Sequence, residues 1–169
     1  MGESILNSKR ILAVDDEPDV LDVLEEEIQG YAPNCIIEKA TTYQEATDRL
    51  ESQTYDVVVL DIMGVRGFDL LDQAVKRNFP AAMLTAHSLD PKSLKRSIEM
   101  GARAYLPKEK LGEIVPFLED IVESSDGTSA WGRLMNALEG YFAGRWGELW
   151  KKSEEKFWKD FDKKTARTK

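Results

Sequence analysis

Apolar and polar residues alternate in short blocks along residues 1–124, and these blocks predict five strands and five helices. Each predicted strand is a run of five mostly apolar residues, and each is followed by polar residues and then by apolar residues at helical spacing. The predicted strands are residues 10–14, 36–40, 56–60, 81–85 and 102–106. The predicted helices are residues 18–30, 43–50, 68–75, 89–100 and 111–122.

This fivefold alternation predicts an α/β fold with a doubly wound parallel sheet covered by helices on both faces. Residues 56–60 contain three consecutive valines, which suits a strand buried on both sides. Ligands of such sheets bind beyond the carboxyl ends of the strands. We therefore expect the functional residues to follow the strands directly.

Polar residues with distinct chemistry stand at these strand ends. Asp15 and Asp16 follow the first predicted strand, Asp61 follows the third, Thr85 ends the fourth, and Lys108 comes shortly after the fifth. Clustered carboxylates repel one another unless a cation joins them, and hard oxygen ligands suit Mg²⁺. An accessible carboxylate can also attack phosphorus, while an ammonium and a hydroxyl can hold the phosphoryl oxygens. The pattern favours Mg²⁺-dependent phosphoryl transfer to Asp61.

The stretches ILAVDDEPDV, YDVVVLDIM, MLTAH and ARAYLPK resemble the receiver domain of bacterial response regulators, over about residues 8–124. The resemblance implies a flavodoxin-like sheet of strand order 2-1-3-4-5. It also implies a role for each matching position: metal binding by Asp15, Asp16, Asp61 and the Met63 backbone carbonyl, phosphate acceptance by Asp61, phosphate binding by Lys108, and switching by Thr85 and Tyr105.

The function implied by this resemblance is a phosphorylation-dependent signalling switch of a two-component system. A histidine kinase or phosphotransfer protein would donate a phosphoryl group to Asp61, and the protein would then act through contacts with an unknown downstream protein. We expect no enzymatic activity beyond Mg²⁺-dependent self-phosphorylation and self-dephosphorylation. His87, two residues after Thr85, is a candidate modulator of dephosphorylation.

Two segments depart from the family pattern. The loop after Asp61 reads Ile-Met-Gly-Val-Arg-Gly and is two residues shorter than usual, without the usual proline. Glu109 follows Lys108 where the family has proline. These changes leave open the alternative of a degenerate receiver that takes no phosphate and acts as a protein-binding or dimerisation module.

Two other functional classes use similar strand-end residues. A phosphatase of the haloacid dehalogenase type would need a second aspartate two residues after its nucleophile, where this chain has Met63. A flavin-binding protein of the flavodoxin type would need room for phosphate after the first strand, where Asp15 and Asp16 stand. Both classes are disfavoured.

The net charge of −8 is distributed unevenly. Residues 1–128 carry 13 Lys+Arg against 25 Asp+Glu, whereas residues 129–169 carry 10 against 6. An acidic body repels nucleic acid. This break in composition predicts a receiver domain over 1–124, a linker over 125–128 and a tail over 129–169.

The tail has aromatic and aliphatic residues at helical spacing, interrupted by glycines at 144 and 147. The pattern predicts two short amphipathic helices whose apolar stripe packs on the receiver, on a second copy in a homodimer, or on another protein. The tail lacks a recognisable DNA-recognition helix, so we expect no specific DNA binding. Its lysines would allow contact with an anionic membrane, but packing on protein is the favoured interpretation.

Cys35 is the only cysteine, so no internal disulfide can form. A reducing compartment fits this composition, and we expect a cytoplasmic protein. The single histidine and single cysteine also argue against a zinc site.

Overall fold

The computed structural model describes residues 3–86, 90–124 and 128–165. Five parallel strands form one sheet in the order β2-β1-β3-β4-β5, which confirms the predicted fold class and strand order. The strands are β1 (Arg10–Val14), β2 (Ile36–Ala40), β3 (Val57–Asp61), β4 (Ala81–Thr85) and β5 (Ala104–Pro107). All residues of β3 and β4 are buried, because helices cover both faces of the central sheet.

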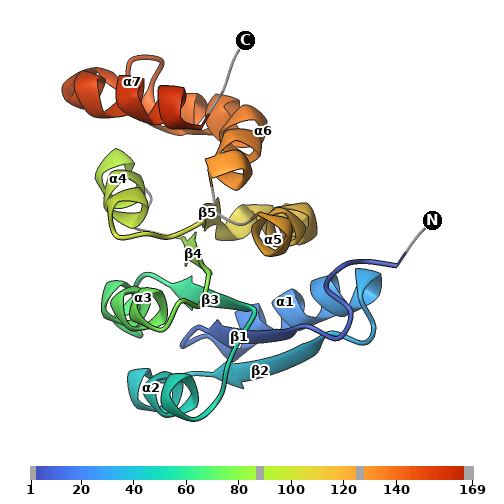
Figure 1. Cartoon of the computed structure of the whole chain (residues 1–169). Helices are drawn as coiled ribbons and strands as arrows, with labels where there is room; N and C mark the ends of the chain where they lie inside the picture. Colours follow the sequence, from blue (N-terminus) through green and yellow to red (C-terminus); the bar gives the residue numbers. More distant parts are fainter. Residues whose placement is uncertain (1–2, 87–89, 125–127, 166–169) are drawn as a thin grey trace.

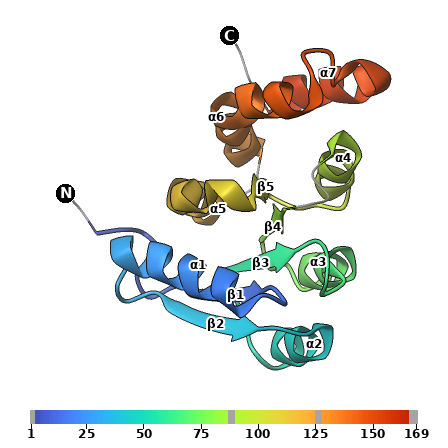
Figure 2. The same cartoon turned by 180° about the vertical axis from the view of Figure 1, so that it is seen from behind.

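Helices α1 and α5 lie on one face of the sheet, and α2, α3 and α4 lie on the other (Figures 1 and 2). Their bounds are α1 (Pro18–Tyr31), α2 (Tyr43–Ser52), α3 (Gly67–Lys76), α4 (Pro91–Glu99), the 3-10 helix η1 (Lys108–Glu113) and α5 (Ile114–Glu123). The core is a continuous apolar cluster between the sheet and these two helical layers. This double winding brings the carboxyl ends of the strands to one open edge.

Most of the predicted boundaries that differ do so by one or two residues, and three differences have a clear structural reason. Gly30 does not end α1, which continues to Tyr31, because a glycine in an ordinary helical conformation only weakens a helix. Strand β5 begins at Ala104 rather than at residue 102, because the chain first passes through a turn with Gly101 at φ +101°. The segment after Lys108 forms η1 before α5 begins.

The chain continues into α6 (Thr128–Trp146), the 3-10 helix η2 (Lys152–Glu154) and α7 (Glu155–Lys164). Helix α6 ends next to Gly147, whose φ of +94° favours glycine. These C-terminal helices lie beyond edge strand β5, next to α4 and α5 (Figures 1 and 2). Among the residues that the structure describes, no helix combines the length and the apolar character needed to cross a bilayer.

Candidate functional site

The ends of four parallel strands bring the candidate residues to one edge of the sheet. Asp61 is the last residue of β3 and pairs in register with Leu84, one residue before Thr85. Thr85 in turn pairs with Pro107, the residue before Lys108. Because the strands are parallel and in this register, side chains far apart in sequence emerge at one place.

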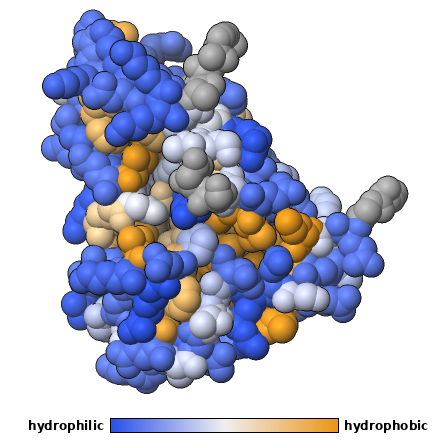
Figure 3. All heavy atoms as spheres, in the orientation of Figure 1, coloured by the Kyte–Doolittle hydropathy of each residue, from blue (hydrophilic) through white to orange (hydrophobic). Residues whose placement is uncertain are grey.

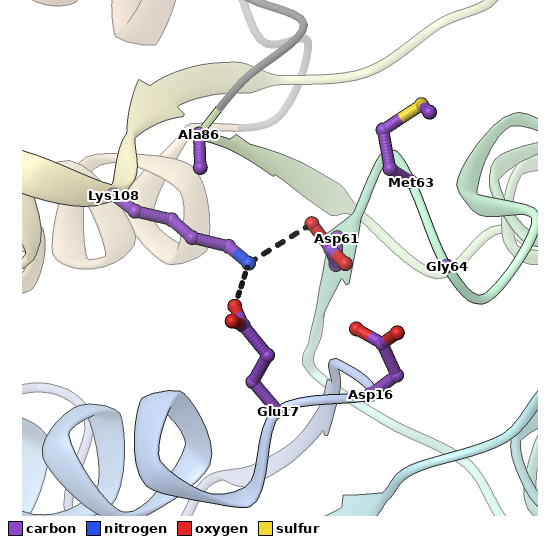
Figure 4. Close-up of a pocket in the computed structure, with 7 residues that line it drawn as sticks. All are labelled: Asp16, Glu17, Asp61, Met63, Gly64, Ala86 and Lys108. Atoms are coloured by element: carbon purple, nitrogen blue, oxygen red, sulfur yellow. Dashed lines mark hydrogen bonds and ion pairs between the residues drawn. The ribbon is translucent and has the colours of Figure 1, made fainter.

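Three aspartates form a cluster at this edge. Asp15, Asp16 and Asp61 each offer a carboxylate oxygen, and these oxygens lie within 4.8 Å of one another. Asp15 and Asp61 are buried, whereas Asp16 is exposed. The cluster opens into a cavity of about 270 Å³ whose lining includes Asp16, Glu17, Asp61, Met63, Gly64, Ala86 and Lys108 (Figure 4).

Lys108 reaches into the cluster from the opposite side of the cavity (Figure 4). Its Nζ lies 2.8 Å from Asp15 Oδ2, 3.0 Å from Glu17 Oε1 and 3.2 Å from Asp61 Oδ1. The contact with Glu17 has hydrogen-bond geometry, and the two aspartate contacts are ion pairs. Burial by itself lowers the pKa of Lys108, but the contacts with Asp15 and Glu17 outweigh burial and raise it. Lys108 is therefore a fixed positive charge.

One lysine does not neutralise this site. Burial, and then the nearby charge of Asp15, raise the pKa of Asp61 from its ordinary value of 3.8 to about 6. Burial likewise raises the pKa of Asp15. Carboxylates held together against their mutual repulsion favour a cation between them. The three aspartates thus fit a hard divalent cation, as the sequence pattern predicts.

The two candidate switch residues are both buried. Thr85 is 1% exposed, and among the described residues its Oγ1 has no hydrogen-bond partner. A buried hydroxyl without a partner carries a desolvation cost. Tyr105 is fully buried, and its hydroxyl lies 2.6 Å from Ser93 Oγ on α4. Thr85 therefore has an unused donor at the same edge of the sheet as the cluster, while Tyr105 is held against α4.

The remaining predicted site residues are Met63 and His87. The side chain of Met63 is exposed and lies at the rim of the cavity (Figure 4). His87 lies outside the described residues. The peptide bond between Lys108 and Glu109 is trans, and no described peptide bond is cis.

Two glycines in the shortened loop were not singled out from the sequence. A Cβ on Gly64, which has a φ of +85°, would lie 2.5 Å from Asp16 Oδ2. A Cβ on Gly67 would lie 2.1 Å from the backbone oxygen of Asp61. The missing side chains let the loop pass close to the Asp16 carboxylate and to the backbone of Asp61, and with this shorter loop Asp61 lies beside Asp15 and Asp16.

Glu17 was also not singled out from the sequence. It directly follows the acidic pair and lines the cavity, where it is the hydrogen-bond partner of Lys108. The available signal was a third consecutive acid before Pro18, which equally suits the start of a helix. Because its partner is 91 residues away in the chain, only the fold reveals the contact.

Replacing Gly64 by alanine is expected to weaken divalent-cation binding about tenfold, because the new Cβ would displace Asp16. Titration calorimetry with Mg²⁺ or Mn²⁺ measures this. The matched control is Gly30→Ala, where a Cβ meets nothing within 4 Å. Equal affinities of the two variants would contradict the role given to Gly64.

A five-stranded parallel sheet with three aspartates and one lysine at its carboxyl edge is consistent with a phosphoacceptor signalling domain. Sequence comparison agrees, since the model of the response regulator receiver domain matches residues 11–118. The chain belongs to this family. This confirms the resemblance, and it places the chain among receivers of response regulators rather than among enzymes.

Known proteins share this region. The chain is 35% identical over 104 residues to sensory transduction protein LytR of Staphylococcus haemolyticus (strain JCSC1435), which is 59% of this chain but only 39% of that protein. The crystal structure of a CheY-like receiver domain protein from Methanospirillum hungatei JF-1 is 25% identical with a TM-score of 0.58, covering 68% of this chain and 96% of that chain. The receiver domain of NtrX from Brucella abortus is 26% identical with a TM-score of 0.58, covering 68% and 99%.

Proposed function

We propose that this protein is a phosphorylation-dependent signalling switch in which Asp61 accepts a phosphoryl group from a histidine kinase or a phosphotransfer protein. The observation that carries the proposal is the position of the Asp61 carboxylate. It borders the cavity, with oxygens of two other aspartates within 4.8 Å and the Lys108 ammonium 3.2 Å away. This arrangement supplies an attacking oxygen together with the charges that phosphoryl transfer requires.

In the proposed reaction, an Asp61 carboxylate oxygen attacks the phosphorus atom of a phosphohistidine. A phosphorus–oxygen bond forms, the phosphorus–nitrogen bond breaks, and the departing imidazole keeps the electron pair and binds a proton. Lys108 would pair with one phosphoryl oxygen, and the unpartnered Thr85 hydroxyl would donate to another. Mg²⁺ bound by Asp15, Asp16, Asp61 and the Met63 carbonyl would neutralise charge on the carboxylates and the phosphoryl oxygens.

We further propose that Thr85 and Tyr105 act as the switch pair. A phosphoryl group would give the buried Thr85 hydroxyl the hydrogen-bond partner that it lacks among the described residues. Phosphorylation also makes the site more negative by about one charge, because a singly charged carboxylate becomes an acyl phosphate with about two charges, and this change can bias a surface with two stable arrangements. His87 remains a proposed modulator of dephosphorylation.

The proposal divides the chain into a receiver over 1–124, a linker over 125–128 and a helical tail over 129–169. Residues 125–127 of that linker lie outside the described residues, and Thr128 begins α6. A receiver domain implies a cognate histidine kinase. The proposed output is a protein–protein contact with a downstream target or a second copy, without specific DNA binding.

The test is incubation of the protein with Mg²⁺ and acetyl phosphate, followed by intact mass measurement. We expect one phosphoryl adduct on the wild type and none on Asp61→Asn. The matched control is Asp72→Asn, which removes an exposed carboxylate paired with Lys76 on α3 and should keep the adduct. An unmodified wild type, or an adduct that survives Asp61→Asn, would favour the degenerate receiver instead.

A further inference from the structure

The C-terminal helices cover the surface formed by α4, β5 and α5, which we call the α4–β5–α5 face. The indole Nε1 of Trp131 on α6 donates a buried hydrogen bond of 2.9 Å to the backbone oxygen of Ala102, just before β5. Around this contact, Leu134, Met135, Leu138 and Phe142 of α6 are all buried. A buried indole bonded to receiver backbone indicates a defined docking mode.

Tyr105 is the point where this packing meets the proposed switch. Its ring lies 6.1 Å from that of Phe142, with an angle of 64° between the planes, and both residues are fully buried. Phe142 continues into an aromatic cluster that spans α6 and α7: Trp131, Trp146, Trp150, Phe157, Trp158 and Phe161. The position of Tyr105 and the packing of the C-terminal helices are therefore coupled.

A second connection starts next to Lys108. The carboxylate of Glu109 lies 3.4 Å from Arg145 of α6, and the ammonium of Lys110 lies 5.2 Å from the ring centre of Tyr141. Glu109 occupies the position where the sequence departs from the family's proline. The two residues that follow the site lysine thus both contact α6.

Charged pairs at the edge of this interface also hold the C-terminal helices in one orientation on the α4–β5–α5 face. Lys95 on α4 pairs with Glu154 of η2 at 2.9 Å, and Asp120 on α5 pairs with Arg133 of α6 at 2.8 Å. The outward surface of α7 is mostly polar (Figure 3), whereas its Trp158 and Phe161 are buried. The C-terminal helices therefore have one apolar side, and the α4–β5–α5 face covers it.

We propose that the C-terminal helices are an intramolecular ligand of the α4–β5–α5 face, and that their docking promotes phosphorylation of Asp61. The inference rests on the proposed function. The direction of the effect of docking on phosphorylation is inferred from Lys108. With α6 docked against Glu109 and Lys110, the Lys108 ammonium lies 3.2 Å from Asp61. In this proposal docking helps to hold the Lys108 ammonium beside Asp61, and by reciprocity a phosphoryl group on Asp61 strengthens docking.

The chain contains its own reporter for this coupling. All four tryptophans, at positions 131, 146, 150 and 158, lie in the C-terminal helices or their connection, and residues 1–124 have none. Intrinsic fluorescence therefore reports only the surroundings of this segment. Adding Mg²⁺ and beryllofluoride, a non-covalent mimic of a phosphoryl group, should change the tryptophan emission of the wild type but not that of Asp61→Asn.

The decisive variant is Phe142→Ala in the full-length chain, which removes the contact with Tyr105. We expect it to bind beryllofluoride about fivefold more weakly or worse, and to form the adduct more slowly. The matched control is Leu149→Ala, in the same segment but 74% exposed, which should behave like the wild type. If Phe142→Ala does not fold, Arg145→Gln tests the contact with Glu109 with a smaller expected loss of about twofold.

The possible results separate this inference from the proposed function. An adduct on Asp61 with unchanged tryptophan emission, and equal beryllofluoride affinity in all variants, would overturn the coupling and leave the phosphoacceptor role intact. No adduct on the wild type would overturn both. An emission change that depends on protein concentration would place the helices on a second copy and overturn the intramolecular assignment.

Discussion

Replacing Lys108 by methionine is expected to destabilise the metal-free protein by about 3 kcal/mol at neutral pH, the lower end of the range for breaking a buried ion pair. Lys108 is the cation that the described structure places beside the buried carboxylates of Asp15 and Asp61. Methionine keeps most of the length and apolar volume of the side chain but removes its charge. Urea unfolding followed by circular dichroism, without divalent cations, measures the loss.

Two conditions should restore stability to Lys108→Met. Mg²⁺ would replace the lost positive charge, and binding to the folded state alone stabilises it by mass action. A lower pH should also reduce the difference in stability between Lys108→Met and the wild type, because a protonated carboxyl needs no cationic partner. Lys108→Met should lower the stability of the Asp61→Asn variant by less than it lowers the stability of the wild type. A loss that is equal with and without Mg²⁺ would show that the side chain contributes through packing rather than charge.

The sheet was predictable because its strands have a strong local signal. Strands β1, β2 and β4 have the predicted bounds, since each is a run of five residues that polar or turn residues delimit. Strand β5 was predicted less well. Ala102 and Arg103 directly precede the apolar run of β5 but lie outside the strand, in the bend after Gly101, a distinction that depends on backbone geometry and not on residue type.

The site was predictable only in part. The end of a strand is marked by neighbouring residues in the sequence, whereas contacts across the sheet join residues far apart in the sequence. Asp15, Asp16, Asp61 and Lys108 could each be placed by the strand that precedes it, and the fold brings all four together. The close approach of Gly64 to Asp16 depends on the path of a loop with positive φ. An irregular loop leaves no periodic pattern of residue types in the sequence, so its path could not be predicted.

The position of the C-terminal helices was the least predictable feature. Their apolar spacing indicates that one side must be covered, but it equally suits the receiver, a second copy or another protein. The choice depends on pairs such as Arg145 with Glu109, which are far apart in sequence and individually weak. In the sequence, Glu109 is notable only because it stands where the family has proline. In the structure, it pairs with Arg145.

Replacing Asp61 by asparagine is expected to stabilise the metal-free protein by about 3 kcal/mol at pH 7.5. The pKa of Asp61 is raised from 3.8 to about 6, chiefly by burial and then by Asp15, and each pKa unit corresponds to about 1.4 kcal/mol. Asparagine keeps the shape of the side chain without its charge. Asp61, the proposed phosphoacceptor, would thus lower the stability of the folded protein through its buried charge.

The pH dependence tests the cause of this gain. At about pH 3 and below, the Asp61 carboxyl is mostly protonated in both the folded and the unfolded chain, so the wild type and Asp61→Asn should be about equally stable. As pH rises from about 4 to 6, the folded state keeps a proton that the unfolded state has already released, and the wild type loses stability relative to the variant. Above about pH 6 the difference should be constant, and Mg²⁺ should reduce it by stabilising the wild type more. Chemical unfolding of both proteins and of Asp72→Asn at several pH values measures it. A variant less stable than the wild type at pH 7.5 would show that the contact with Lys108 outweighs the burial of the Asp61 charge.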